Sequence, residues 1–266
     1  MPTGTLLVAM SPAHYFDDRP AVASRRREVD LAVPGETLRL ASDRGVFSSD
    51  RLDPGTRHLL DVALHDPAVP RPPAGDLLDL GCGWGPIALC LARCLARSDP
   101  ATRVWALDVN QRALALVAEN AGRLGLDNVR PVTADQVPAG LVFAGIWSNP
   151  PVRIGKAALH QLLGTWLPRL APSGSAWLVV HRHLGADSLA SWLGDAGWAV
   201  RRAASKSGYR VLDVRRRQGD RSEDGPGVDG RSGDGPRQGN RSEDGPRQGD
   251  RSEDGRPDPG AIPGAW

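Results

Sequence analysis

Lysine, cysteine, aromatic residues and long apolar runs are all scarce in this chain. Lysine occurs only at Lys156 and Lys206, so arginine carries nearly all of the positive charge. The three cysteines, Cys82, Cys90 and Cys94, have no partnering histidine, and a structural zinc site would need a fourth ligand. No apolar run reaches ~18 residues, and no basic segment leads into an apolar stretch at the N-terminus. We therefore expect a cytoplasmic protein with no metal site and no membrane contact.

Large apolar side chains are also nearly absent from the last part of the chain. From Arg217 the sequence repeats a ten-residue pattern, RQGDRSEDGP, which is rich in Gly, Pro, Ser and mixed charge. Such a composition cannot bury enough apolar surface to offset the entropy of an ordered backbone. We predict that residues 217–266 form a disordered decapeptide-repeat tail. This tail holds 8 Arg and 11 acidic residues, so the rest of the chain is about five charges positive, which is compatible with a polyanionic substrate.

Residues 1–66 are predicted to form an extension made of a β-hairpin and a helix. Alternating apolar residues at 29–33 and 37–40 flank the turn Pro34-Gly35, which is the pattern of a hairpin. A helix is expected over residues 56–64. A proline-rich connector then leads into the main part of the chain.

Strands and helices alternate regularly through residues 67–216. Such a repeat requires parallel strands joined by right-handed crossovers, hence helices on both faces of the sheet. The expected strands are 77–80, 104–109, 129–132, 141–147, 176–181, 198–202 and 209–214. The expected helices are 86–96, 111–124, 157–167 and 188–196. We predict an α/β fold, a doubly wound and mostly parallel seven-stranded Rossmann-like sheet, in which ligands bind beyond the carboxyl ends of the strands.

A glycine-rich turn follows the first strand of this sheet. Its glycines are Gly81, Gly83 and Gly85, and Pro86 stands where a dinucleotide-binding loop has its last glycine. Asp79, at the end of the strand, would repel a pyrophosphate but suits a cationic amino group. The motif therefore favours a nucleoside that carries a methionine over NAD.

Two further acids follow the next strands. Asp108 ends the second strand, where a carboxylate can accept hydrogen bonds from both hydroxyls of a ribose. A helix N-cap or a solvated strand end is the alternative for Asp108. Asp135, after the third strand, can contact the adenine amino group, or it can be an ordinary turn residue. Together with the glycine turn, these acids indicate S-adenosylmethionine as the cofactor.

The segment Asn149-Pro150-Pro151 ends another predicted strand. An exocyclic amine or an amide nitrogen is a poor nucleophile because its lone pair is delocalised. It becomes reactive when acceptors hold its N–H groups, and the Asn149 side-chain oxygen and the Pro150 carbonyl can do this while the prolines stiffen the turn. The segment therefore predicts a catalytic site for N-methylation.

The residues after this segment are expected to meet the substrate. Val152 stands where many such motifs have an aromatic residue that stacks on the target base. Stacking then has to come from another residue, with Trp84, Trp147 and Phe47 as candidates, or be replaced by apolar packing. Arg153 and Lys156 follow this segment directly, and we predict that they contact the phosphates of the RNA. Arg25-Arg26-Arg27 is a second candidate for phosphate contact, although a charge run is usually a solvated face.

Several ordered blocks of this sequence resemble one known family. They are His14-Tyr15-Phe16, Gly45-Val46-Phe47-Ser48, Leu52-Asp53, Gly55-Thr56, residues 79–87, Asp108-Val109-Asn110, Asn149-Pro150-Pro151 with Arg153 and Lys156, and Gly208-Tyr209. On these blocks, residues 14–214 resemble the small-domain (MTS) class I S-adenosylmethionine-dependent methyltransferases. The resemblance is to the short, single-domain branch of the bacterial ribosomal RNA guanine-N2 methyltransferases.

The resemblance implies S-adenosylmethionine as the methyl donor and a guanine N2 amine of ribosomal RNA as the acceptor. It also implies that Phe47, Ser48 and Thr56 fold over the methionine end of the cofactor. The family often has a basic pair followed by Gln-Gly-Ala after the fifth strand, and here Arg182-His183 is followed by Leu184, so the Gln is lost. We expect RNA as the partner of a monomer or homodimer.

Two alternatives remain open on the residues alone. The same grip on an amine serves a glutamine amide in a protein or adenine N6, although the missing aromatic residue speaks against adenine. The second alternative is a chain that only binds the cofactor and acts by binding RNA or an assembly partner. The presence of Asp79, Asp108 and Asn149 argues against that loss of catalysis.

Overall fold

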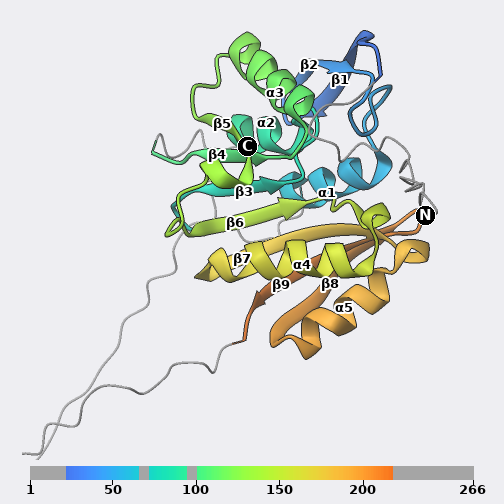
Figure 1. The fold of residues 1–266 in the computed structure, drawn as a ribbon, viewed down its shortest axis with the longest axis vertical. Helices are drawn as coiled ribbons and strands as arrows, with labels where there is room; N and C mark the ends of the chain where they lie inside the picture. The colour runs from blue at the N-terminus through green and yellow to red at the C-terminus, as the bar shows by residue number, and fades with distance from the viewer. Residues whose placement is uncertain (1–21, 66–71, 95–100, 218–266) are drawn as a thin grey trace, which may run out of the picture. The chain divides into compact units, whose positions relative to one another are not determined.

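The seven strands of the main sheet lie in the order β5-β4-β3-β6-β7-β9-β8, which confirms the predicted fold class (Figure 1). The computed structural model describes residues 22–65, 72–94 and 101–217. The strands are β3 (Leu77–Leu80), β4 (Val104–Leu107), β5 (Val129–Val132), β6 (Phe143–Ser148), β7 (Leu170–His181), β8 (Trp198–Lys206) and β9 (Tyr209–Arg216). The first five are parallel to one another, whereas β9 is antiparallel to both β7 and β8.

The predicted hairpin forms a separate two-stranded sheet of β1 (Arg26–Val33) and β2 (Glu36–Asp43). Its buried side chains, such as Leu31 and Leu40, belong to the same apolar cluster as the first helices of the main sheet. The hairpin therefore has no core of its own. The described residues all fall within one compact unit.

Helices cover both faces of the main sheet. One apolar cluster joins the hairpin to α1 (Pro54–His65), α2 (Pro86–Cys94) and α3 (Gln111–Leu124), and a second cluster lies under α4 (Lys156–Trp166) and α5 (Ala186–Asp195). The strands supply alternate residues to the two clusters, as a pleated strand must. In β7, for example, Trp177 faces the first cluster and Leu178 the second.

The element borders differ from the predicted ones most at β7, and β8 also runs to Lys206 rather than to 202. β6 begins at Phe143 rather than at 141, and β7 begins at Leu170 rather than at 176. The reason is an irregular register: Phe143 pairs with Leu170, whereas Gly145 already pairs with Ser175. The part of the predicted tail after Arg217, the family block at residues 14–16 and the end of the predicted helix 86–96 lie outside the described residues.

Chain order reverses between β3 and β6, because β4 and β5 extend the sheet in one direction and β6 and β7 in the other. Such a reversal opens a crevice beyond the carboxyl ends of the two strands. Both sequence motifs follow these two strands, since the glycine turn comes after β3 and Asn149 comes after β6.

Candidate functional site

The glycine turn and the Asn-Pro-Pro segment face each other at the carboxyl edge of the sheet. A methyl group placed at Gly81 would meet Cδ of Pro151 at 3.8 Å. The two strands behind them are tied together by the buried Ser148 hydroxyl, which donates a 2.6 Å hydrogen bond to the Leu80 carbonyl. The two predicted motifs therefore lie side by side at this edge of the sheet.

The three glycines of the turn all have positive φ angles, +76° at Gly81, +55° at Gly83 and +92° at Gly85, which side chains rarely adopt. Their surroundings differ. A Cβ atom at Gly83 would meet nothing within 4 Å, so the described chain leaves this face of the turn open. A Cβ atom at Gly85 would lie 2.9 Å from Cγ2 of Val117, so that glycine allows α2 and α3 to pack closely.

Asp108 connects the glycine turn to the end of β4. One carboxylate oxygen accepts a 2.9 Å hydrogen bond from the Gly83 backbone N–H, and the other accepts one of 2.9 Å from Asn110 N–H. A carboxylate has about four lone-pair positions and the Val109 N–H interacts with it as well, so Asp108 keeps at least one position for a hydroxyl group. Burial raises the pKa of Asp108, against the effect of these hydrogen bonds. Its position suits the predicted contact with ribose.

Asp79 is completely buried beneath the turn. One carboxylate oxygen accepts a 2.9 Å hydrogen bond from the Ala88 N–H in the first turn of α2. The other oxygen has no hydrogen-bond partner among the described residues. Burial, with the nearby charge of Asp108, raises the pKa of Asp79 to about 8. Asp79 thus fixes the helix behind the turn, and its contact with a cationic amino group stays a prediction.

Asn149, which is partly buried, is held by two residues from the start of α1. Its side-chain nitrogen donates a 2.8 Å hydrogen bond to Oδ2 of Asp53 and one of 3.0 Å to Oγ1 of Thr56. An amide nitrogen has two hydrogens, so both are used. The side-chain oxygen is therefore the atom that Asn149 can offer to an incoming amine.

The two prolines form a tight turn after Asn149. Pro151 has φ −74° and ψ 68°, and the Val152 N–H donates a 2.7 Å hydrogen bond to the Pro150 carbonyl, which defines an inverse γ-turn. The carbonyl predicted to hold the amine therefore already accepts one hydrogen bond and keeps one lone pair. Val152 itself packs against the second apolar cluster, whereas Arg153 and Lys156 are exposed.

The remaining predicted cofactor residues have different surroundings. Phe47 is exposed, and Ser48, with a φ of +51°, donates a hydrogen bond to the Arg51 carbonyl. Thr56 is buried, and its hydroxyl accepts the hydrogen bond from Asn149. Asp135 is exposed in a short 3-10 helix (Ala134–Gln136), where it accepts a hydrogen bond from the Thr133 hydroxyl.

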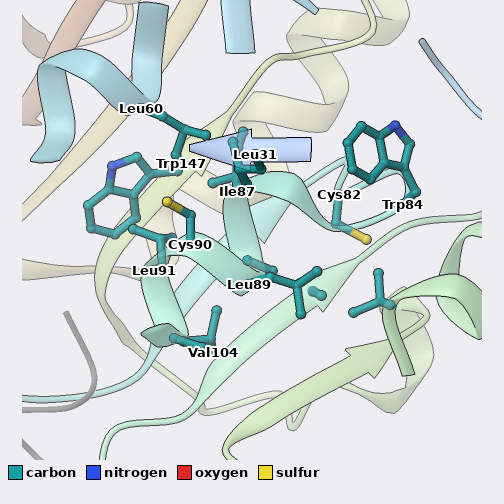
Figure 2. Packing of buried hydrophobic residues seen from close by; sticks show 14 of the residues in the cluster. Leu31, Leu60, Cys82, Trp84, Ile87, Leu89, Cys90, Leu91, Val104 and Trp147 are labelled. Carbon is teal, nitrogen blue, oxygen red and sulfur yellow. The ribbon is translucent and has the colours of Figure 1, made fainter. Parts of the chain in front are cut away.

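Three aromatic residues were candidates for stacking on a base, and the prediction is wrong for two of them. Trp84 and Trp147 are each only 2% exposed, and Figure 2 shows both indoles within the apolar cluster that also holds Leu60 and Leu91. Phe47, at 45% exposed, is the one that reaches the surface. Sequence reasoning missed that Trp84 points away from the turn into the core.

One aspartate and two asparagines that hydrogen-bond the segments of the site to one another were not predicted as site residues. Asp53 caps α1 and also binds Asn149. Asn110 caps α3 and donates a 2.9 Å hydrogen bond to the Gly45 carbonyl, so it fixes the segment that carries Phe47. The sequence did carry a signal for Asp53, because an Asp followed by Pro is typical of a helix start.

The third is Asn120, which is completely buried in α3. Its side chain accepts a hydrogen bond from the Ala41 N–H at 2.6 Å and donates one to the Ala41 carbonyl at 2.9 Å, as a neighbouring strand would. It also donates to the Trp84 carbonyl at 3.2 Å. One side chain thus joins the hairpin, α3 and the glycine turn.

The described residues contain no group of three or more His, Cys, Asp or Glu side chains that could hold a metal ion. Among the helices of the described ranges, none is long and apolar enough to cross a membrane.

Comparisons with known proteins agree with this architecture. The profile of the methyltransferase small domain (MTS) matches residues 37–213. The uncharacterized protein YbxB of Bacillus subtilis (strain 168) is 34% identical over 207 residues, which is 76% of this chain and 98% of that protein. The ribosomal RNA small subunit methyltransferase C of Pseudomonas aeruginosa (strain LESB58) is 32% identical over 224 residues, 79% of this chain but only 59% of that enzyme.

A solved structure shows the same fold. It is the T. thermophilus 16S rRNA N2 G1207 methyltransferase (RsmC) in complex with AdoMet and guanosine, which is 22% identical with a TM-score of 0.60. The match covers 74% of this chain and 52% of that one. The chain thus spans about half the length of the ribosomal RNA methyltransferases that it matches.

Proposed function

The chain belongs to the methyltransferase small domain family, and we propose that it uses S-adenosylmethionine to methylate the N2 amine of a guanine in ribosomal RNA. The observation that supports this most directly is the state of Asn149. Both of its amide hydrogens are donated to Asp53 and Thr56, so its oxygen is left to receive an amine. Pro151, the second residue after it, faces the glycine turn, since a Cβ atom at Gly81 would lie 3.8 Å from its Cδ.

The residues at the carboxyl edge fit such a cofactor. The open face of Gly83, the spare lone pair of Asp108 and the unpartnered oxygen of Asp79 are the groups that would hold it. When bound, S-adenosylmethionine supplies a methyl group on a positively charged sulfur, which keeps the electron pair of the broken bond. We assign Gly81 and Gly85 to the shape of the turn. We assign Phe47, Ser48 and Thr56 to the methionine end of the cofactor and Asp135 to its adenine.

The chain's own contribution to the reaction is to hold the nucleophile. The Asn149 oxygen and the remaining lone pair of the Pro150 carbonyl each accept one N–H of the amine. Held in this way, the amine nitrogen becomes pyramidal and its lone pair is no longer delocalised into the aromatic ring. The lone pair can then attack the methyl carbon of the cofactor. The alkylated nitrogen loses a proton readily, so the site needs no strong base.

RNA contact is proposed at Arg153 and Lys156. Both are exposed, both follow the Asn-Pro-Pro turn, and neither forms an ion pair with another described residue. The candidate run at 25–27 is less suited, because Arg26 pairs with Glu119 at 2.6 Å and Arg27 with Asp50 at 3.4 Å. A ribosomal RNA substrate also places the protein in the cytoplasm.

The proposal is tested by methyl transfer from labelled S-adenosylmethionine to separated RNA and protein fractions. The purified chain is compared with Asn149→Ala, and the labelled product is identified by mass spectrometry. Label in RNA as N2-methylguanosine, lost in the variant, supports the proposal. Label in adenine or in a glutamine amide replaces the substrate, and cofactor binding with no transfer to either fraction points to a non-catalytic protein.

A further inference from the structure

Asp53 stands behind the residue that holds the amine. Its Oδ2 atom lies 2.8 Å from the side-chain nitrogen of Asn149, and the Thr56 hydroxyl lies 3.0 Å from the same nitrogen. A carboxylate can only accept hydrogen bonds, so it must face the NH₂ group of the amide and not its oxygen. The charge of Asp53 therefore determines which end of the Asn149 amide points away from α1.

The position of Asp53 is itself tightly fixed. It caps α1, since Oδ2 accepts a 3.0 Å hydrogen bond from Thr56 N–H and its carbonyl accepts one of 2.8 Å from Arg57 N–H. Tyr209 and Asp53 leave no room for a side chain at Gly55. A Cβ atom there would lie 2.6 Å from the ring of Tyr209 and 2.9 Å from Oδ2 of Asp53, so any larger residue would displace one of them.

The negative charge of Asp53 acts locally in this partly buried place. It contributes, after burial, to the raised pKa of the Tyr209 hydroxyl. Hydrogen bonds from an amide to a carboxylate polarise the amide and make its oxygen a stronger acceptor. The same charge favours the positive charge that develops on a nitrogen as it is alkylated.

We propose that Asp53 is a positioning residue for methyl transfer, which orients and polarises the Asn149 amide so that its oxygen receives the substrate amine. This inference rests on the proposed function, because it requires that Asn149 hold the amine. It gives the segment before α1 a second task beyond any contact with the cofactor. Asp53 itself touches neither the amine nor the methyl group in this account.

The first test is Asp53→Ser. Serine is as good an N-cap as aspartate, so α1 should stay intact, but its side chain is too short to keep the bond to Asn149. A lost charged hydrogen bond predicts a kcat about 10- to 100-fold lower, with the dissociation constant for S-adenosylmethionine changed less than about twofold. Asp53→Asn, which keeps an oxygen acceptor without the charge, should recover part of this loss. Asp61→Ser, also on α1, is the matched control and should behave as wild type.

The second test needs no turnover. The side-chain NH₂ signals of Asn149 in an NMR spectrum are assigned by their loss in Asn149→Ala. In Asp53→Ser these signals should move upfield as the bond to the carboxylate is lost, whereas Asp61→Ser should leave them in place. Unchanged signals in Asp53→Ser would overturn the inference.

A double variant separates this inference from the proposed function. If Asp53 acts through Asn149, then Asp53→Ser should lower kcat in the wild-type background but should leave unchanged the slow residual rate of Asn149→Ala, measured by long incubation with labelled S-adenosylmethionine. Equal losses in both backgrounds contradict the positioning role while leaving the methyltransferase proposal intact. Full activity of Asn149→Ala would instead refute the amine grip, and with it both proposals.

Discussion

The carboxylate of Asp108 and the backbone N–H of Gly83 are joined by a 2.9 Å hydrogen bond, although 25 positions separate them in the chain. The bond exists because β3 and β4 are parallel neighbours whose carboxyl ends lie at the same edge of the sheet. It holds the middle of the glycine turn against the acid that we assign to the ribose. Asp108 therefore shapes the site as well as offering acceptors to a ligand.

Replacing Asp108 should weaken cofactor binding in two steps. Asp108→Asn keeps an oxygen for Gly83 but loses the charge, and Asp108→Ala loses every acceptor. We expect the binding free energy for S-adenosylmethionine to fall by about 1 kcal/mol in the first variant and by about 2–3 kcal/mol in the second. Isothermal titration calorimetry measures both, and an unchanged affinity in Asp108→Ala would remove Asp108 from the cofactor site.

Gly83 and Gly85 should respond differently to alanine. Gly83→Ala meets no atom within 4 Å and should destabilise the fold by only ~1–2 kcal/mol for its positive φ, while its methyl group enters the open face and weakens cofactor binding. Gly85→Ala brings a Cβ atom to 2.9 Å from Val117, which adds overpacking and should destabilise the fold by about 2–5 kcal/mol. Thermal unfolding and calorimetry on the two variants test the contrast. Equal effects on stability would contradict it.

Asp79 should make the stability of the ligand-free protein depend on pH. Its pKa is about 8 in the folded chain against the ordinary value of 3.8, so between these values the folded state binds one proton more than the unfolded state. The contribution of Asp79 to the free energy of unfolding is therefore greatest below about pH 4 and falls as the pH rises to about 8. Asp79→Asn keeps an acceptor for Ala88 and does not titrate.

Urea unfolding at several pH values between 4 and 8 measures this effect. Between pH 4 and 8 the wild type releases a proton when it unfolds, so its free energy of unfolding falls as the pH rises. Asp79→Asn releases none at this position, so its stability relative to wild type should increase with pH. Parallel curves for the two proteins would show that Asp79 is ionised in the folded chain.

Asn120 should be among the most important polar residues for stability. Asn120→Ala leaves the Ala41 N–H, the Ala41 carbonyl and the Trp84 carbonyl without their partner inside the protein. We expect the free energy of unfolding to fall by about 2–4 kcal/mol. Arg123→Ala, on the same helix but in surface ion pairs, is the control and should lose at most about 1 kcal/mol. Similar losses in both variants would contradict the role given to Asn120.

The sheet and its motifs could be predicted from the sequence because they depend on local patterns. Apolar periodicity gave the strands, and the spacing of Gly81, Gly83 and Gly85 gave the turn between β3 and α2. The carboxyl-edge position of Asp108 and Asn149 then followed from the parallel topology alone. These features need no knowledge of which side chains meet across the chain.

What the sequence could not provide was the set of contacts between distant segments. The hydrogen bonds from Asn149 to Asp53 and from Asn120 to Ala41 join residues that are 96 and 79 positions apart. The sequence offers Trp84 and Trp147 as candidates for stacking on a base, yet packing against the hairpin and helices buries both. Local pattern does not determine which face of a turn a side chain takes.

The most direct test of the central claim is nucleoside mass spectrometry of ribosomal RNA from cells that lack this gene. The same cells are complemented with the wild-type chain or with Asn149→Ala. Our account predicts that one N2-methylguanosine disappears from ribosomal RNA on deletion, returns with the wild-type chain and does not return with the variant. An unchanged set of N2-methylguanosines in the deletion strain would contradict it.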